Sequence, residues 1–392
     1  MTRVPVQNPD GTPAMSTKAS RARRWVRDGK ATGHWNDAGI YYVRLVVEPS
    51  GRKVQKVTIG VDPGKSYTNI AVQSAKATLY LAHLVLPFQR VKERIGAATI
   101  KNGKVIKNAR GRALHRRVRR GQRINRKIPF EQRAHRQKRF DNRRRDGKIA
   151  PSIRAAREMD LRIVSELSKI YPVGSIVYEV IKADVDLTSG RRGARSGKGF
   201  SPVMVGQKWA IKQLQSIATV KTVLGWQKNG NGTSQIRKHL ELTKIKDKKA
   251  QTPESHAVDG IALAATEFIR FGLVPKIGYD LHTWIGSVTI TSAPFRTIAR
   301  PEYFRRALHF DKADKGGKRK RKGGTITPFD VRCGDRVMAT KSGETVIGWV
   351  GGYTQTAKSK NISVYDHNSK RLGQYAPSKV RLIRRSNKLC VA

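Results

Sequence analysis

Residues 57–86 contain short runs rich in apolar and β-branched residues, a pattern typical of β-strands. Three such runs, at 57–64, 68–73 and 77–86, are separated by short polar turns. Consecutive strands joined by turns this short pair antiparallel, so the pattern predicts a three-stranded meander. Its first strand carries a carboxylate, Asp62, among apolar neighbours.

A shorter mixed pattern precedes the meander. Residues 4–7 predict an extended piece, and the Asn-Pro-Asp-Gly sequence at 8–11 predicts a turn, because Pro and Gly supply the dihedral angles that turns need. Residues 18–30 carry four arginines and predict a basic helix, and the β-branched and aromatic run at 40–47 predicts a strand. We therefore expect residues 1–56 to form a small basic module.

Beyond residue 151 the helical period appears. Residues 152–170 place their apolar side chains on one stripe of an amphipathic helix, and Pro172 ends it. Thr252-Pro253 has the residue types of an N-cap and a first helical position. The further predicted elements are a strand at 175–180 and helices at 207–220 and 254–271. This order of elements predicts an α/β fold with helices packed against a sheet.

Past residue 283 the pattern changes to short strands with Gly turns. A run rich in Lys, Arg and Gly at 311–324 predicts a flexible basic linker. The expected strands lie at 335–340, 344–349, 361–365 and 380–384. Short strands at this spacing are typical of a small β-barrel.

The amino-acid composition indicates a binding partner. The 392 residues include 80 Lys and Arg but only 28 Asp and Glu, which leaves a net charge of +52. A polyanion would neutralise that self-repulsion, so nucleic acid is the expected partner. A membrane surface would need an apolar span or a long amphipathic helix, and the sequence shows neither. The Arg-rich first thirty residues do not resemble a secretory signal, and we expect a cytoplasmic protein.

The densest charge lies at 110–148, where 17 of 39 residues are Lys or Arg and three are acidic. A solvated basic face is the ordinary explanation of a charge run, but one this dense favours contact with a phosphate backbone. At helical spacing, five of its arginines would line one side of a long helix. The arginines expected to bind nucleic acid are Arg110, Arg112, Arg116, Arg117, Arg119, Arg120, Arg123, Arg126, Arg133, Arg136, Arg139, Arg143, Arg144 and Arg145.

Candidate chemistry rests on Asp62, Glu179, His256 and Asp259. Phosphodiester hydrolysis by two metal ions needs hard oxygen ligands that converge from different elements. Taken alone, each candidate has an ordinary explanation: Asp62 can end a strand, Glu179 can form a salt bridge, and His256 and Asp259 can share a helix face without a function. Their combination, in this order and on these elements, predicts a metal-dependent nuclease site.

The sequence resembles a known family at these positions. The runs 57–65 (Val-Thr-Ile-Gly-Val-Asp-Pro-Gly-Lys), 176–179 (Ile-Val-Tyr-Glu) and 254–260 (Glu-Ser-His-Ala-Val-Asp-Gly) resemble the three split segments of a RuvC nuclease. The Arg-rich region lies where RNA-guided effectors insert a bridge helix. Residues 10–16 (Asp-Gly-Thr-Pro-Ala-Met-Ser) resemble the Pro-Leu-Met-Pro signature of the IscB and IsrB group, departing from it at Ala14 and Ser16.

The chain lacks features that two related nucleases, IscB and TnpB, would require. IscB carries an HNH nuclease between the second and third RuvC segments, but here 76 residues separate Glu179 from His256, with one His and no Cys. TnpB would need a Cys-rich zinc motif, and Cys333 and Cys390 are the only cysteines. The resemblance is therefore to IsrB, the relative without HNH.

The resemblance implies an RNase H-like mixed sheet and an RNA-guided nickase that cuts the non-target strand. It implies two Mg²⁺ ions, with Mn²⁺ as an alternative: Asp62 would bridge both, Glu179 would hold one and Asp259 the other, and His256 would ligate or move a proton. The implied partners are a structured guide RNA (omega RNA) in a 1:1 complex with one protein chain, and double-stranded target DNA.

The same resemblance divides the chain. The expected parts are an N-terminal module (1–56), RuvC segment one (57–90), the bridge helix region (91–150), RuvC segments two and three (151–282), and a target-interaction-like β module (283–392) that would read a flanking motif.

Two other functions stay open. A junction resolvase without a guide would explain the carboxylates but not the Arg-rich insertion. A ribosome-associated or RNA-chaperone protein would explain the net charge of +52 but leaves Glu179 and Asp259 without a role.

Overall fold

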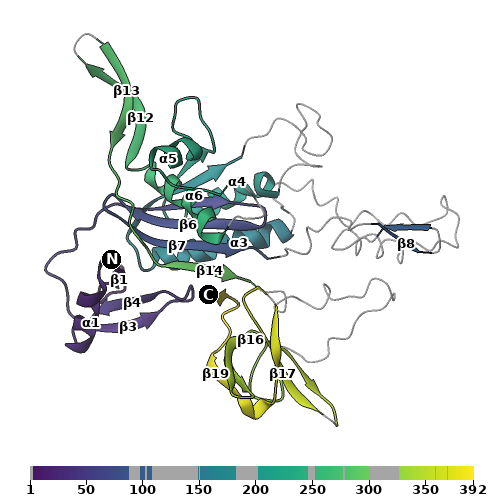
Figure 1. Cartoon of the computed structure of the whole chain (residues 1–392). Coiled ribbons are helices and arrows are strands. Elements are labelled where there is room, and N and C mark those ends of the chain that lie inside the picture. Colours follow the sequence, from purple (N-terminus) through teal and green to yellow (C-terminus); the bar gives the residue numbers. More distant parts are fainter. Residues whose placement is uncertain are drawn as a thin grey trace, which may run out of the picture. The chain divides into compact units, whose positions relative to one another are not determined.

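The computed structural model describes most of the chain outside the Arg-rich segments (Figure 1). The described residues are 3–87, 98–101, 104–107, 149, 151–181, 202–245, 252–276, 279–300, 326–357, 359–368 and 370–392. The arginines predicted to bind nucleic acid at 110–145, and the linker predicted at 311–324, lie outside these residues. The chain divides into two compact units: Met1–Leu86 with Ile149–Ala299 and Val391–Ala392, and Pro87–Lys148 with Arg300–Cys390.

A seven-stranded mixed sheet forms the centre of the first unit. Its order is β11-β10-β5-β6-β7-β14-β20. The strands are β5 (Val57–Pro63), β6 (Tyr67–Ser74), β7 (Ala77–Val85), β10 (Val173–Val180), β11 (Thr219–Leu224), β14 (Phe295–Ala299) and β20 (Cys390–Val391). β5, β6 and β7 pair antiparallel, so the predicted meander is confirmed. β10 runs parallel to β5 and β11 parallel to β10, which completes a mixed α/β sheet.

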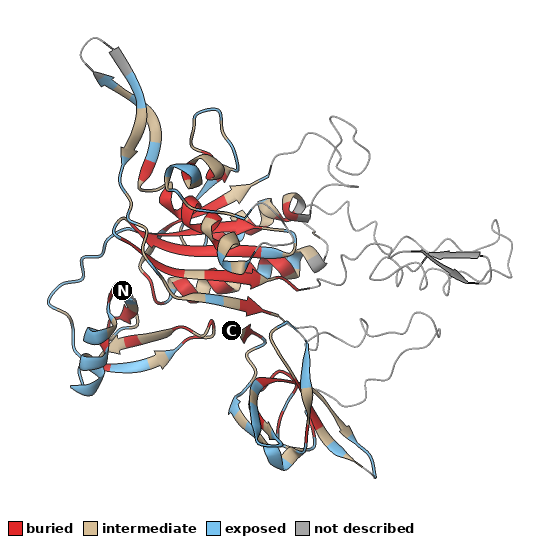
Figure 2. Cartoon of the chain, viewed as in Figure 1, coloured by how far each residue is buried: buried red, intermediate tan, exposed pale blue. Residues whose placement is uncertain are grey.

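Helices lie on both faces of this sheet. α6 (Pro253–Ala265) packs against β5, β6 and β7, and α3 (Pro151–Ser168) packs against α4 (Pro202–Leu214). Along β10, Val177 contacts Leu263 of α6, whereas the next residue, Tyr178, contacts Arg157 of α3. Successive side chains of a strand point to opposite faces, so α6 and α3 cover opposite sides. Figure 2 shows the buried strands between them.

Burial on both faces explains why the central strands are almost continuously apolar. All seven residues of β5 are buried, and seven of the eight residues of β6 are. The polar residues inside these strands, including Asp62, are therefore exceptions that need partners.

The N-terminal module is a four-stranded sheet with one helix. The sheet has the order β2-β1-β4-β3, with β1 (Arg3–Gln7), β2 (Pro13–Lys18), β3 (Ala31–Trp35) and β4 (Tyr41–Leu45), and α1 spans Ala19–Arg27. Val6, Ala22 and Val43 form its core. The basic helix and the strands at either end were predicted, whereas β2 and β3 were not. The module is tied to the segment directly after α3, since Gln7 Nε2 donates to the carbonyl of Lys169 at 2.7 Å.

Residues 326–384 of the second unit hold an antiparallel sheet of order β18-β17-β16-β15-β19. Its strands are β15 (Arg336–Lys341), β16 (Glu344–Gln355), β17 (Lys360–Tyr365), β18 (Arg371–Tyr375) and β19 (Val380–Arg384), with a 3₁₀ turn at Pro377–Lys379. Val337, Val350 and Val364 lie in its core. Four of the five strands were predicted. Within the described residues no ladder joins β18 to β19, so the sheet is open rather than a closed barrel.

Two predicted helices are shorter or shifted. The helix expected at 207–220 is α4, which begins at Pro202 and ends at Leu214, because the β-branched alternation of 219–223 forms β11. The helix expected at 254–271 ends at Ala265, where Thr266 Oγ1 bonds back to the carbonyl of Leu263 and the chain turns.

The remaining elements are short or form hairpins. β12 (Ile269–Lys276) and β13 (Tyr279–Gly286) make one hairpin, β8 (Ala98–Lys101) and β9 (Lys104–Lys107) another, and α5 spans Thr233–His239. β14, inside the range assigned to the C-terminal module, pairs with β7 of the core sheet. None of the helices in the described part of the chain is long and apolar enough to cross a membrane.

Candidate metal centre

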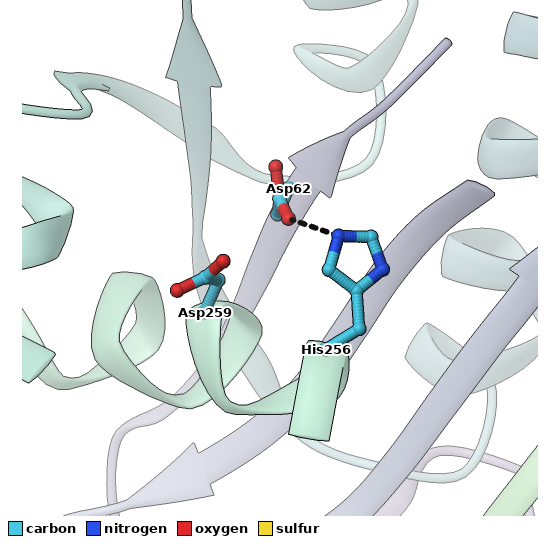
Figure 3. A group of neighbouring side chains, drawn as sticks. All are labelled: Asp62, His256 and Asp259. Atoms are coloured by element: carbon cyan, nitrogen blue, oxygen red, sulfur yellow. Dashed lines mark ion pairs between the residues drawn. The ribbon is translucent and has the colours of Figure 1, made fainter. Parts of the chain in front are cut away.

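The candidate site lies where β5 and β10 end beside the start of α6. Tyr178 of β10 pairs with Val61 of β5, so Glu179 and Asp62, the next residues, lie side by side on the face covered by α6. Figure 3 shows Asp62 on its strand with His256 and Asp259 projecting toward it from one side of α6. Three segments far apart in the sequence therefore meet at one point.

A close helix–strand contact brings α6 to this position. A Cβ atom on Gly60 would lie 2.0 Å from the carbonyl oxygen of Gly260 and 2.6 Å from the backbone nitrogen of Ala264. Only a residue without a side chain permits that approach. The start of the helix is fixed by Thr252, whose side chain accepts a hydrogen bond from the backbone nitrogen of Ser255.

One potential ligand atom from each of Asp62, His256 and Asp259 lies within 4.8 Å of the others. His256 Nε2 is 3.9 Å from Asp62 Oδ2, the contact drawn in Figure 3. Burial lowers the pKa of His256, an effect that Asp62 opposes and Lys244 reinforces. His256 is therefore neutral near pH 7 and keeps a nitrogen lone pair free to bind a metal or a proton.

Glu179 has the most perturbed carboxyl group of the site. Burial, together with the negative charge of neighbouring Asp62, raises the pKa of Glu179 to about 8. Two carboxylates this close repel each other unless a cation lies between them. The elevated pKa is thus what a metal-free acidic site is expected to show.

A row of hydrogen bonds runs from Asp62 across the sheet. Asn69 of β6 pairs with Asp62, and its Nδ2 donates to Asp62 Oδ2 at 3.0 Å. Its Oδ1 then accepts from Nδ1 of His83 on β7, at 2.9 Å. Burial lowers the pKa of His83 to about 4, so His83 is neutral and holds its proton on Nδ1. The row fixes the rotamer of the Asp62 carboxylate.

Two cations bind Asp259. Arg237 Nη1 of α5 pairs with Asp259 Oδ1, and Lys244 Nζ pairs with Asp259 Oδ2. Asp259 is buried, so both contacts are partly shielded from water. A metal ion at Asp259 would compete with these cations for its oxygens.

A buried ion pair supports the site from the opposite face of the sheet. Arg157 of α3 lies 3.0 Å from Asp160, and both side chains are at most 2% exposed. Arg157 Nη2 also donates to the carbonyl of Gly64 at 3.0 Å, in the turn directly after β5. α3 therefore holds the backbone that follows Asp62.

The donor set fits a hard divalent cation. Asp62, Glu179 and Asp259 supply carboxylate oxygens, which Mg²⁺ and Mn²⁺ prefer, and His256 adds one nitrogen ligand. The perturbed pKa of Glu179 is a second sign, because a nearby cation would stabilise its charged form.

Sequence comparison places the chain in a family. A model of the family described as "RRXRR protein" matches residues 4–199, which are 196 of the 392 residues. The chain belongs to the RRXRR family. The matched range includes the arginine run 116–120, Arg-Arg-Val-Arg-Arg.

This RRXRR family protein was also compared with curated proteins, of which none matches significantly, and with solved structures. A Thermus thermophilus RuvC structure in complex with a Holliday junction substrate is 14% identical, covers 54% of this chain and 91% of that chain, and has a TM-score of 0.23. A second Thermus thermophilus RuvC structure is 13% identical, with 54% and 92% coverage and a TM-score of 0.22.

In this RRXRR family protein, the four residues singled out from the sequence lie together, and their roles remain predictions. Sequence reasoning missed Asn69 and His83, although a polar residue within an apolar strand was the available signal. It also missed Arg237, which lies on α5, and Lys244, which follows α5, because no local sequence pattern indicates that these residues lie beside Asp259.

Proposed function

We propose that this protein is a metal-dependent DNA endonuclease of the IsrB type, guided by RNA, that nicks the displaced strand of a matched duplex. The observation that carries the proposal is the convergence of Asp62, Glu179, His256 and Asp259 from two adjacent strands and one helix. The RRXRR family is found in IscB- and IsrB-like proteins, which supports the guided reaction over an unguided one.

The proposed chemistry assigns each side chain a task. Asp62, Glu179 and Asp259 would hold divalent cations through carboxylate oxygens, with Asn69 keeping the Asp62 carboxylate in place. The ions, when bound, would supply an activated water and charge neutralisation for the leaving oxygen. His256, neutral near pH 7, offers Nε2 as a ligand or as the acceptor of the water's proton.

The proposal gives the excess positive charge a role. A guide RNA and its heteroduplex would neutralise the net charge of +52, with the arginines of 110–145 on the backbone and the β15–β19 sheet as the reader of a flanking motif. The 76 residues between Glu179 and His256, with one His and no Cys, leave no room for an HNH domain, which supports a single-strand cut.

The test is a cleavage assay with the protein–RNA complex and a duplex labelled separately on each strand. Wild type should cut the displaced strand alone in Mg²⁺. Asp62→Ala should lose more activity than the about 10–100-fold that outer partners of a metal site typically cost, because it removes a ligand. It should still bind the RNA and the target, as should Asp10→Ala, a matched change of an exposed carboxylate that leaves cleavage intact.

Other outcomes would redirect the proposal. Retained cleavage by Asp62→Ala would refute the assigned site, and cuts in both strands would refute the nickase assignment. Cleavage of four-way junction DNA without RNA would indicate a resolvase instead.

A further inference from the structure

A tryptophan stands exposed at the edge of the candidate site. Trp226 is 62% exposed, which is unusual for the largest apolar side chain. It lines an open cleft of about 340 Å³ together with Glu179, Val180, Ile181, Leu224 and Gly225. The same cleft thus has a carboxylate of the metal centre and an indole ring on its wall.

The backbone that carries Trp226 is held in place by α5. Ser234 donates to the carbonyl of Gly225 through both its backbone nitrogen, at 2.9 Å, and its Oγ, at 2.7 Å. Gln235 Oε1 accepts from the backbone nitrogens of Gln227, at 3.1 Å, and Gly232, at 3.0 Å. The turn therefore presents a solvent-exposed indole on a fixed backbone.

The close approach of the turn to itself supports this rigidity. A Cβ atom on Gly232 would lie 2.5 Å from the Cα of Trp226. Fixing the backbone in advance reduces the entropy lost when the ring binds a ligand. An aromatic ring held in this way is suited to stacking.

We propose that Trp226 stacks an unpaired nucleobase of the strand being cut, close to the scissile phosphate. The inference rests on the proposed function, because it takes the phosphate to lie at Asp62, Glu179 and Asp259. Glu179 pairs with Val223, three residues before Trp226. At ~3.3 Å per strand residue the separation along the strand is at most about 10 Å. Nucleotides rise by about 3.4 Å each, so the stacked base lies within about three nucleotides of the cut.

The chemistry of the cleft favours a nucleobase over other occupants. Every base has a π-face that stacks on an aromatic ring regardless of sequence, but only in a strand that is not paired. The cations Arg237 and Lys244 at Asp259 are each about a quarter exposed and can attract the phosphates on either side. The site would therefore admit single-stranded DNA and disfavour an intact duplex.

The first experiment is a cleavage assay in which single abasic positions are moved along the displaced strand. In wild type, one abasic position within about three nucleotides of the cut should slow single-turnover cleavage by about 5- to 150-fold, the equivalent of one stacked base. Trp226→Ala should be slowed similarly on intact DNA and no further by that abasic position. Trp226→Tyr should restore most of the rate.

A matched control is Trp35→Ala, because Trp35 of β3 is also 62% exposed but belongs to the N-terminal sheet. Its cleavage rate and abasic profile should equal those of wild type. A flat abasic profile in wild type, with cleavage unaffected by Trp226→Ala, would overturn the stacking site and leave the nuclease intact.

A second readout does not need cleavage. In the Asp62→Ala protein–RNA complex, 5-iodouracil at the sensitive DNA position should photocrosslink to Trp226, as mapped by mass spectrometry. If the crosslink to Trp226 forms but the wild-type complex never cuts DNA, the stacking site is supported and the proposed nuclease function is refuted. A crosslink from the guide RNA in place of the DNA would refute the stacking of the cut strand.

Discussion

Glu179 is a carboxyl group that the fold places in a half-buried position beside another carboxylate. Its strand is apolar on both sides, and the Asp62 carboxylate is its in-register neighbour. A metal ion or a proton can relieve the repulsion, and without metal the proton binds with a pKa raised to about 8. The same residue should therefore link metal binding, protonation and stability.

The sign of this link gives a prediction. The pKa of Glu179 is above its unfolded value of about 4.5, so the folded state binds the extra proton. Without metal, the free energy of unfolding should therefore decrease as the pH rises from about 4.5 to about 8. Glu179→Gln keeps the shape without the charge. In a chelator, its unfolding temperature should exceed that of wild type by a few degrees at pH 8, and the difference should shrink toward pH 5.

Glu158→Gln is a suitable control, because Glu158 is an exposed carboxylate that pairs with Arg154 on the same helix. Its difference from wild type should not vary over this pH range. Thermal unfolding of the full-length protein, followed by circular dichroism, measures all three proteins. A Glu179→Gln protein that is less stable than wild type at pH 8 would contradict the charge argument.

The catalytic candidates could be proposed from the sequence because they occur in combination, in this order and on these elements, although each alone has an ordinary explanation. Glu179 interrupts an apolar strand, and His256 and Asp259 are three residues apart on a helix with a recognisable N-cap. Arg237 could not be proposed in this way. It lies on α5 and reaches Asp259 because α5 packs against α6, and no local sequence pattern indicates that tertiary contact.

At the scale of elements, α3 supports the site from the face of the sheet opposite α6. Its Arg157–Asp160 pair is buried, and burial raises the pKa of Asp160 to about 6 even though Arg157 opposes the shift. Desolvation of Asp160 therefore outweighs its attraction to Arg157, and loss of Arg157 would leave that cost unopposed. Arg157 also binds the Gly64 carbonyl, so it joins α3 to the turn after β5.

Removing one member of the Arg157–Asp160 pair should strongly destabilise the folded state. Arg157→Met leaves the buried Asp160 without its cation and should lower the free energy of unfolding by about 3–5 kcal/mol. Arg154→Met, on the exposed face of the same helix, should change it by at most about 1 kcal/mol, because surface ion pairs contribute little. Urea unfolding of the metal-free protein measures both.

A double variant separates stability from positioning. Arg157→Met combined with Asp160→Leu removes both buried charges and should recover part of the lost stability. It should not recover Mn²⁺ affinity, since the Gly64 carbonyl still lacks its donor. Equal recovery of stability and metal affinity would show that Arg157 acts on the fold alone.

Element types were easier to predict than element ends. The meander of β5, β6 and β7 was predicted because three apolar, strand-like runs are separated by short polar turns. α4 and α6 end earlier than expected, since the apolar residues that follow belong to β11 and β12. An apolar residue is compatible with either structure, and the sheet's hydrogen bonds decide between them.

At the scale of the whole molecule, charge outweighs every other feature. The net charge of +52 exceeds what a free protein of 392 residues tolerates without strong self-repulsion. The described core sheet accounts for little of it, because most of its residues are apolar and buried. The protein should therefore be found with a polyanion in the cell, and the identity of that polyanion distinguishes the remaining functions.

Guided and generic binding predict different RNA after purification. A generic basic protein binds mixed RNA through charge alone. A wash with about 1 M NaCl reduces the screening length to about 3 Å and should therefore remove the mixed RNA. A guide held by shape as well as charge should survive that wash. We expect sequencing of the RNA retained from a host with the native locus to give one discrete non-coding RNA with one variable end.

The unfolding temperature gives a second comparison between specific and generic binding of RNA. If the discrete RNA is present, adding it to the stripped protein should raise the unfolding temperature more than an equal charge of heparin does, because specific binding to the native state adds stability by mass action. If the retained RNA is a heterogeneous mixture and heparin stabilises as well, the charge is generic. The carboxylates at Asp62 and Glu179 would then serve an unguided nuclease.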